Sequence, residues 1–259
     1  MKKGTAHLNL GKGDSSLNCK GSRVVGGSMT KLLLALLFIL CIALPVSAAA
    51  DAIWAESFYI RFDADSFQNY THARQAIDFE NIHYPLLNAA IFYSTNQMRR
   101  KHSMPPFVHA QSLEEAAFMH ASDMVRLNFF SHTNPHEPNK RTFSQRLAMY
   151  GVEQGYRAEN ISEMFGIRYI QGSSLIPPDT TGGEIRDFET GKSIPKHTYF
   201  SFASALLDGW MASSGHRANI LNSNLKYLGC GAHHYHNESF YGMDQFKAVQ
   251  NFASVVPDG

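Results

Sequence analysis

Four segments before residue 216 carry apolar side chains at the spacing of helices. In residues 112–130, "SLEEAAFMHASDMVRLNFF", the apolar positions follow one another in steps of three and four, which gathers them on one face of a helix. His120 falls on this apolar stripe, and a histidine there is more often a hydrogen-bonded core residue than a ligand. The same spacing predicts helices in residues 83–102, 141–151 and 198–215.

The ends of these helices carry residues that start or stop a helix. Pro85 lies in the first turn of its helix, where a missing N–H is no disadvantage. Ser112 and Glu115 predict a capping box, in which each side chain bonds the other residue's free backbone N–H. Gly151 and Gly215 are expected to end the helices that precede them.

Two late segments predict strands. Residues 226–236, "KYLGCGAHHYH", and residues 245–256, "QFKAVQNFASVV", are joined by a loop around residues 237–243. Helices first and an antiparallel pair at the end favour an α+β fold built of packed layers over a parallel α/β fold.

The first of these strands contains a cysteine and a run of histidines. Cys230 lies between two glycines, and we interpret it as a small buried hydrophobe rather than a reactive nucleophile. Strand alternation puts His234 and His236 on one face and His233 on the other. These histidines could bind a metal, but we favour the interpretation that the run is a surface feature.

The chain has the layout of a secretory signal peptide at residues 29–48. Lys31 precedes an apolar run at residues 32–44, which is shorter than the roughly 20 residues of a membrane span. Small residues lead up to Ala48, so we expect cleavage after it, with Ala50 as the other candidate. An uncleaved membrane anchor is the alternative. Cleavage would leave Cys230 as the single cysteine, so that stability would come from packing and not from a disulfide.

The remaining sequence suggests further divisions of the chain. We expect translation to start at Met29, which would make residues 1–28 a non-native N-terminal extension. Residues 49–83 are rich in aromatics and are expected to be an N-terminal extension that packs on the main domain, residues 84–256. Within that domain, residues 166–197 are dense in Gly, Pro, Ser and Thr, which predicts a loop insertion.

Composition and charge narrow the classes of partner. The chain is 44% hydrophobic and 12% aromatic, as expected of a folded core. A formal net charge of +1 gives no general attraction to nucleic acid, and none is expected as a partner. The signal segment predicts an exported protein, periplasmic or extracellular, that touches a membrane only if this segment stays uncleaved.

Three residues could supply chemistry together. His132 lies in "FFSHTNP", Glu159 in "YRAENIS" and His216 in "SSGHRANILN", each at the edge of a helix or turn, so that they could converge on one cleft. Two imidazoles and a carboxylate are a workable ligand set for Zn²⁺, with water completing the site. The same trio could instead hold itself together by hydrogen bonds, with the carboxylate fixing the tautomer of one ring.

Seven sequence blocks occur in an order that matches a known family. They are "LLNAA…NQMRRKH", "SLEEAAFMHASDM", "FFSHTNP", "RAENIS", "LLDGWMASSGHRANILN", "YLGCGA" and "AVQNFAS". Together they resemble the CAP superfamily, also called SCP, which includes plant pathogenesis-related proteins, venom allergens and cysteine-rich secretory proteins. The resemblance is greatest to the bacterial exported members and covers roughly residues 84–256.

The resemblance implies a three-layer α-β-α sandwich with a central antiparallel sheet and a large cleft. In that cleft the family places two histidines and usually two acidic residues. The motif positions correspond to His132, Glu159 and His216. The second acidic position of animal and plant members is occupied here by Ser213, so this chain departs from the pattern. Arg217 either contacts a carboxylate or the rim of the cleft, or is a solvated surface arginine.

The resemblance also implies what the cleft does. Several family members bind a divalent metal between the two histidines, which here are His132 and His216. The expected function is therefore an exported, non-enzymatic module whose cleft binds a metal, or a lipid, glycan or protein ligand. The alternative is a peptidase-like hydrolase, metal-dependent or metal-independent, that uses His132, Glu159 and His216 and acts in the cell envelope or outside the cell. It is disfavoured because the chain lacks H-E-x-x-H and G-x-S-x-G motifs and offers no evident nucleophile.

Overall fold

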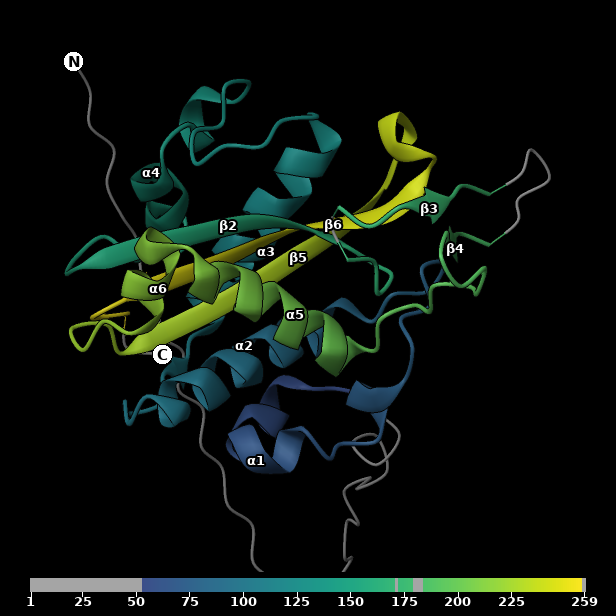
Figure 1. The fold of residues 1–259 in the computed structure, drawn as a ribbon. Coiled ribbons are helices and arrows are strands. Elements are labelled where there is room, and N and C mark those ends of the chain that lie inside the picture. Colours follow the sequence, from purple (N-terminus) through teal and green to yellow (C-terminus); the bar gives the residue numbers. More distant parts are fainter. Residues whose placement is uncertain (1–52, 171, 179–183, 258–259) are drawn as a thin grey trace, which may run out of the picture. The chain divides into compact units, whose positions relative to one another are not determined.

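The computed structural model describes residues 53–170, 172–178 and 184–257, and the expected signal segment at 29–48 lies outside them. The described residues form an α+β fold in three layers, with a sheet between two layers of helices (Figure 1). No helix in these ranges is long and apolar enough to cross a membrane.

The central sheet has the strand order β1-β5-β6-β2. Its strands are β1 (Val108–His109), β2 (Arg157–Phe165), β5 (Tyr227–Asn237) and β6 (Met243–Ala253). The predicted antiparallel pair is confirmed as β5 and β6, and β2 extends it antiparallel on the other side of β6. The short β1 pairs parallel to β5, so the sheet is mixed at this edge. At the opposite edge, β2 pairs with no other strand of the described residues.

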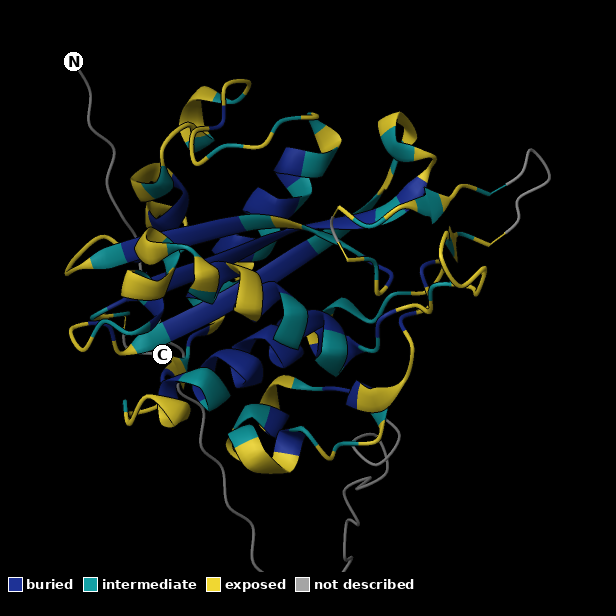
Figure 2. Ribbon diagram, in the orientation of Figure 1, coloured by how far each residue is buried: buried dark blue, intermediate teal, exposed yellow. Residues whose placement is uncertain are grey.

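Helices cover both faces of the sheet. One layer contains α2 (Tyr84–Lys101), α5 (Tyr199–Ala212) and α6 (Ser214–Ile220), and the other contains α3 (Gln111–Arg126) and α4 (Phe143–Ala148). Smaller elements are α1 (Ala64–Phe67), the 3₁₀ turns η2 (Glu56–Ile60), η3 (His72–Arg74), η4 (Pro138–Lys140) and η5 (Glu238–Phe240), and the strand pair β3 (Leu175–Ile176) and β4 (Arg186–Asp187). Buried residues gather on the sheet and on the helix sides that face it (Figure 2).

The glycines of "YLGCGA" allow α3 to approach β5 closely. A Cβ atom at Gly229 would lie 2.0 Å from the backbone nitrogen of Glu114, and one at Gly231 would lie 2.3 Å from that of Phe118. Between them, Cys230 is buried and packs into the opposite layer. Burial raises the pKa of its thiol, which keeps it protonated and unreactive. The interpretation of Cys230 as a small core residue is confirmed.

The capping box predicted at the start of α3 is wrong. The helix begins at Gln111, its N-cap is Ala110, and no side chain caps it. The backbone N–H of Ala110 donates to the carbonyl of Leu228, so the pairing of β1 with β5 fixes where the helix starts. Ser112 therefore falls inside the first turn, where it cannot act as the cap.

Gly215 does not end α5, contrary to the prediction. The helix ends at Ala212, and Ser213 has extended backbone angles, with φ −86° and ψ 126°. Gly215 instead lies inside the next short helix, α6. The helix before Gly151 does end as expected, since α4 stops at Ala148 and Gly151 adopts a positive φ of 77°.

Residues 53–83 pack on α2 through a cluster of aromatic rings. The ring of Trp54 lies 5.3 Å from that of Tyr59, 5.4 Å from that of Phe67 and 5.9 Å from that of Tyr93 on α2. Because these side chains converge on one indole rather than on a helix face, the segment shows no regular apolar period.

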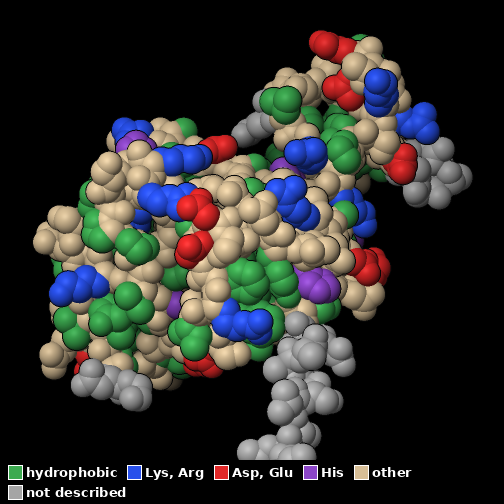
Figure 3. Space-filling view, turned by 90° about the horizontal axis from the view of Figure 1, so that it is seen from below, with side chains coloured by type: hydrophobic (Ala, Val, Ile, Leu, Met, Phe, Trp, Pro, Cys, Tyr) green, Lys and Arg blue, Asp and Glu red, His purple; other side chains and the backbone are tan. Residues whose placement is uncertain are grey.

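On the face shown in Figure 3, basic and acidic side chains are interspersed, in line with the formal net charge of +1.

We predict that Gly229→Ala destabilises the fold strongly because its new methyl group would collide with the backbone of α3. The expected loss is about 3 kcal/mol in the free energy of unfolding, at the upper end of overpacking effects. Urea unfolding measures it. Gly209→Ala is the matched control, since Gly209 lies exposed within α5 with open space around it, and it should raise stability by up to about 1 kcal/mol. Equal stability of the two variants would contradict the close approach of α3 and β5.

Candidate functional site

A buried carboxylate joins two of the predicted residues to an arginine. Glu159, on β2, is only 8% exposed. Its Oε1 lies 2.8 Å from Nδ1 of His132, which belongs to the loop between α3 and η4. Nη2 of Arg146, on α4, lies 2.9 Å from both carboxylate oxygens. The structure therefore brings His132 and Glu159 into direct contact.

The electrostatics of this cluster determine the ionisation state of the Glu159 carboxylate. Burial raises the pKa of Glu159, but the hydrogen bond from His132 and the charge of Arg146 outweigh it, so that the pKa is lowered overall. Glu159 is therefore ionised at neutral pH and can only accept hydrogen bonds. His132 must then donate from Nδ1. In the neutral ring this leaves a lone pair on Nε2, and the side chain of His132 is 53% exposed.

Arg146 is a site residue that the sequence analysis missed. It is 1% exposed, and besides Glu159 its Nη2 donates to the carbonyl of His132 at 3.0 Å. It thus holds both the carboxylate and the backbone of the residue that the carboxylate orients. One signal in the sequence could have revealed it. Arg146 stands beside Leu147 on the inward side of a predicted helix, and a charged side chain buried there needs a partner.

His216 approaches from the other face of β2. Glu159 and Asn160 are neighbours on this strand, so their side chains point to opposite faces. Asn160 is fully buried, donates to the carbonyl of His216 at 3.3 Å and accepts from Asn219 at 2.8 Å. The strand therefore holds His132 on one face through Glu159 and α6 on the other through Asn160, and Figure 1 shows α4 and α6 on opposite sides of β2.

The ring of His216 is half-buried and is held mainly neutral. Burial lowers its pKa, and the charge of the nearby His132 lowers it further. A neutral imidazole keeps a lone pair on one nitrogen. His216 can therefore accept a hydrogen bond or bind a metal at neutral pH.

The far end of α6 is anchored by a buried arginine of α2. Nη1 of Arg99 donates to the carbonyl of Ile220 at 2.7 Å and to that of Asn222 at 3.1 Å. Burial lowers the pKa of Arg99 to about 10, so it stays charged at neutral pH and its bonds to carbonyls are charge-assisted. Ile220 is fully buried, as expected of a residue that fixes this segment to the core.

Ser213 and Arg217 lie on the His216 side of the site. Ser213 joins α5 to α6 and is partly exposed. Arg217 is exposed and donates to the carbonyl of Met211 at 2.7 Å, near the end of α5. Within the described residues Arg217 forms no ion pair with a carboxylate. Its hydrogen bond instead stabilises the junction between α5 and α6.

His120 is a core residue beneath this site. It is fully buried on α3, and its Nε2 lies 3.1 Å from the carbonyl of Ser131. Burial lowers its pKa to about 4, so the ring is neutral and donates to that carbonyl. The interpretation of His120 as a hydrogen-bonded core histidine is confirmed.

In the part of the chain that the structure describes, the cleft trio does not form a compact set of ligand atoms. The group with all ligand atoms within 4.8 Å of one another is His234, His236 and Asp244. The predicted alternation of the histidine run is confirmed, but its interpretation as a surface feature is wrong for His234, whose side chain is only 11% exposed.

The contacts of Glu159 decide which of the predicted residues could hold a metal. The oxygens of Glu159 are engaged by Arg146 and His132, so Glu159 orients a ligand and does not add one. Metal-binding histidines commonly donate their second ring N–H to such a carboxylate. His132 and His216 are therefore the residues that would hold the ion.

Comparison with known proteins assigns the family. The model of the cysteine-rich secretory protein family, CAP, matches residues 92–252. The chain therefore belongs to the CAP family, as its motifs predicted.

The relatives that match are bacterial. YlbC, an uncharacterized membrane protein of Bacillus subtilis, is 26% identical over 147 residues, which are 56% of this chain and 32% of that protein. YkwD, an uncharacterized protein of the same organism, is 27% identical over 137 residues, or 53% of this chain and 38% of that protein. The chain thus spans about a third of the length of these curated relatives.

A similar solved structure is that of an extracellular protein of Bacillus anthracis that contains an SCP domain. It is 25% identical in sequence with a TM-score of 0.43. The match covers 66% of this chain and 41% of that one.

We predict that Arg146→Met lowers the free energy of unfolding at pH 7 by about 3–5 kcal/mol, because it leaves the Glu159 carboxylate buried without its counter-charge. The double variant Arg146→Met/Glu159→Gln should recover part of the loss. Arg141→Met, at an exposed arginine nearby, is the control and should change stability by less than about 0.5 kcal/mol. Urea unfolding of the four proteins tests this, and similar losses in the two single variants would contradict it.

The lowered pKa of Glu159 predicts an acid-sensitive contribution to stability. That contribution is fully present above the ordinary value of 4.5 and is lost as the pH falls through the lower value of the folded state. Between pH 5 and pH 3, the free energy of unfolding should therefore fall more steeply in the wild type than in Glu159→Gln. Glu153→Gln, at an exposed glutamate, should keep the wild-type slope. Parallel slopes for the wild type and Glu159→Gln would show that Glu159 is not stabilised as a carboxylate.

Proposed function

We propose that the chain is an exported CAP-domain protein whose cleft, formed by His132, Glu159 and His216, binds a ligand or a divalent metal without catalysing a reaction. The observation that carries this proposal is the contact of the His132 ring with an ionised, buried Glu159. This contact holds the half-exposed imidazole of His132 in a defined tautomer. Export is supported by the signal-peptide pattern at residues 29–48.

Divalent Zn²⁺ is the metal that this cleft suits best. Imidazole nitrogens are common ligands of Zn²⁺, and water completes sites with few protein ligands. A bound ion would supply positive charge and a Lewis acid to whatever ligand enters the cleft. His132 would bind through the nitrogen that faces away from Glu159, and His216 would bind as a neutral ring.

The expected ligands other than a metal are a lipid, a glycan or a protein surface. The chemistry of the site favours the polar ones among these three. The groups that the site offers are imidazoles, the hydroxyl of Ser213 and the exposed Arg217. These groups donate and accept hydrogen bonds, as sugar hydroxyls and peptide groups require. They support a glycan or a peptide over the acyl chain of a lipid.

A hydrolase is the second candidate. One observation is compatible with it, since the ring of His216, whose pKa burial lowers, is neutral at neutral pH and can accept a proton. Covalent hydrolysis also needs a nucleophile beside that base. Within the described residues, neither the ring of His132 nor that of His216 is hydrogen-bonded to a hydroxyl or thiol group. The balance therefore favours binding.

We predict that the purified protein binds one equivalent of Zn²⁺ in this cleft, measured by isothermal titration calorimetry. His132→Ala and His216→Ala should each abolish that equivalent. Glu159→Gln should weaken it about 10-fold or more, because the orienting carboxylate is lost. His136→Ala, an exposed histidine of the same loop as His132, should leave it unchanged.

Two outcomes would count against this prediction. Zn²⁺ binding that neither cleft variant alters would mean that the histidines do not share a metal. Peptide hydrolysis by the Zn²⁺-loaded wild type that both variants abolish would favour the hydrolase instead.

A further inference from the structure

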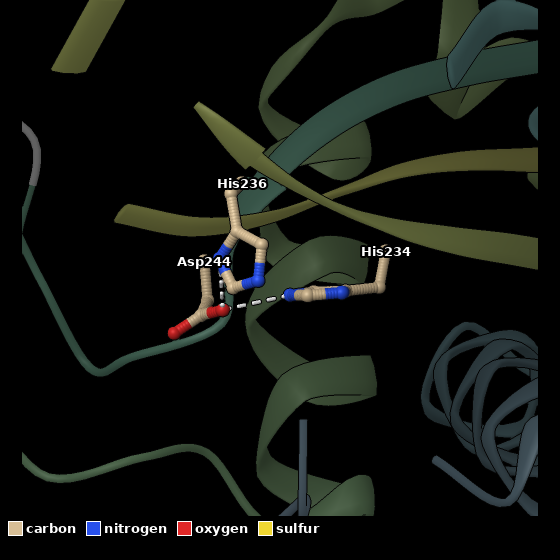
Figure 4. A group of neighbouring side chains, drawn as sticks. All are labelled: His234, His236 and Asp244. Carbon is tan, nitrogen blue, oxygen red and sulfur yellow. Dashed lines mark hydrogen bonds and ion pairs between the residues drawn. The ribbon is translucent and has the colours of Figure 1, made fainter. Parts of the chain in front are cut away.

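A second group of metal-binding side chains lies at the end of the β5–β6 pair, away from the cleft. The register of these strands places His236 directly opposite Asp244 and places His234 opposite Phe246. His234 and His236 are two residues apart, so their side chains share a face of the sheet with Asp244. Figure 4 shows the two rings converging on the carboxylate.

The distances within this group are close to those that a metal requires. Oδ1 of Asp244 lies 2.8 Å from Nε2 of His234 and 3.0 Å from Nδ1 of His236. Ligand atoms around a tetrahedral Zn²⁺ lie about 3.3 Å apart, since the bonds are about 2.0–2.1 Å long. Small side-chain rotations would therefore open the group enough to admit an ion.

From this geometry we propose that His234, His236 and Asp244 form a binding site for a divalent transition metal, with Zn²⁺ as the best match. Two imidazoles and one carboxylate are the protein ligands of many zinc sites that keep one position open. Mg²⁺ and Ca²⁺ prefer oxygen ligands and are disfavoured here. The proposal does not depend on whether the cleft binds a metal.

The surroundings hold the ligands in place before any ion arrives. The ring of His234 stacks on Phe79, with 5.4 Å between ring centres and 8° between planes, and lies 5.2 Å from the ring of Phe246. The backbone carbonyl of Asp244 accepts from the N–H of Gly166 at 2.7 Å. Side chains fixed in this way lose little conformational entropy on binding. The side chain of His236 is 54% exposed, which gives the ion a path from solvent.

The site borders a cavity that can supply the remaining ligand. Asp244 and Phe79 line a cavity of about 650 Å³ together with Glu184, Tyr241 and Lys196. The ammonium of Lys196 lies 4.4 Å from the centre of the Phe79 ring. A metal with an open coordination position beside a lysine suits an anionic oxygen ligand, such as a carboxylate or a phosphate, as well as water.

Titration with Co²⁺, a spectroscopic substitute for Zn²⁺, tests the proposal. The experiment uses the purified protein carrying His132→Ala and His216→Ala, so that the cleft cannot contribute. We expect one equivalent of Co²⁺ to bind, with the absorption of a low-coordinate ion, and Zn²⁺ to displace it. In this background, His236→Gln and Asp244→Asn should each weaken binding at least 10-fold.

His233→Gln is the matched control, because His233 belongs to the same run but its ring stacks with that of Tyr84, 5.2 Å away. It should bind Co²⁺ as tightly as the background protein. Because His236 is half-exposed, its replacement should leave urea unfolding of the metal-free protein unchanged. The proposal is overturned if the background protein binds no Co²⁺, or if His236→Gln binds it as tightly as His233→Gln does. Neither result would bear on the cleft, whose test uses His132 and His216.

Discussion

The buried ion pair between Glu159 and Arg146 is the interaction on which the arrangement of the candidate site depends. A carboxylate at the centre of a fold is strongly unfavourable unless its charge is paired and its oxygens are hydrogen-bonded. Arg146 meets both requirements from α4 and also binds the carbonyl of His132. The pair therefore fixes three segments, namely β2, α4 and the loop that carries His132. Glu159 is a means of positioning an imidazole more than a reactive group in its own right.

The second imidazole depends on uncharged polar contacts that start from the same strand. Asn160 bonds the backbone of α6, and its amide also donates to Gln250 at 3.0 Å. Gln250 in turn donates to Thr95 of α2 at 2.7 Å. This buried chain runs from β2 through β6 to α2, so the segment that carries His216 is tied to the core of the domain. The two faces of β2 thus carry different polar networks, one that holds His132 through Glu159 and one that holds α6 through Asn160.

Much of the fold could be predicted from the sequence, because apolar periodicity reflects burial and burial defines the helix faces. Helices α2, α3, α4 and α5 and the β5–β6 pair were expected close to where they lie. Strand β2 was not, since Glu159 and Asn160 occupy buried positions that normally hold apolar side chains. Gly215 suggested a helix end, whereas Arg99 and Asn160 hold the surrounding segment in a further helix. His132 and His216 were identified as candidate site residues through their motifs. Arg146 and Asp244 were not, because their partners adjoin them only after the chain has folded.

Both roles proposed for His132, as a metal ligand and as a hydrogen-bonding group, require that an ionised Glu159 holds its ring as the Nδ1–H tautomer with a free lone pair on Nε2. Long-range ¹H–¹⁵N NMR of the histidine rings at pH 8 measures this directly, with the His132→Ala variant to assign the signal. We expect Nδ1 of His132 to be protonated and Nε2 unprotonated in the wild type, and Glu159→Gln to shift the ring toward the Nε2–H form that free histidine prefers. A wild-type His132 that is protonated on Nε2 alone would contradict the proposed role of Glu159, because such a ring cannot donate to Glu159 or offer Nε2 to a ligand.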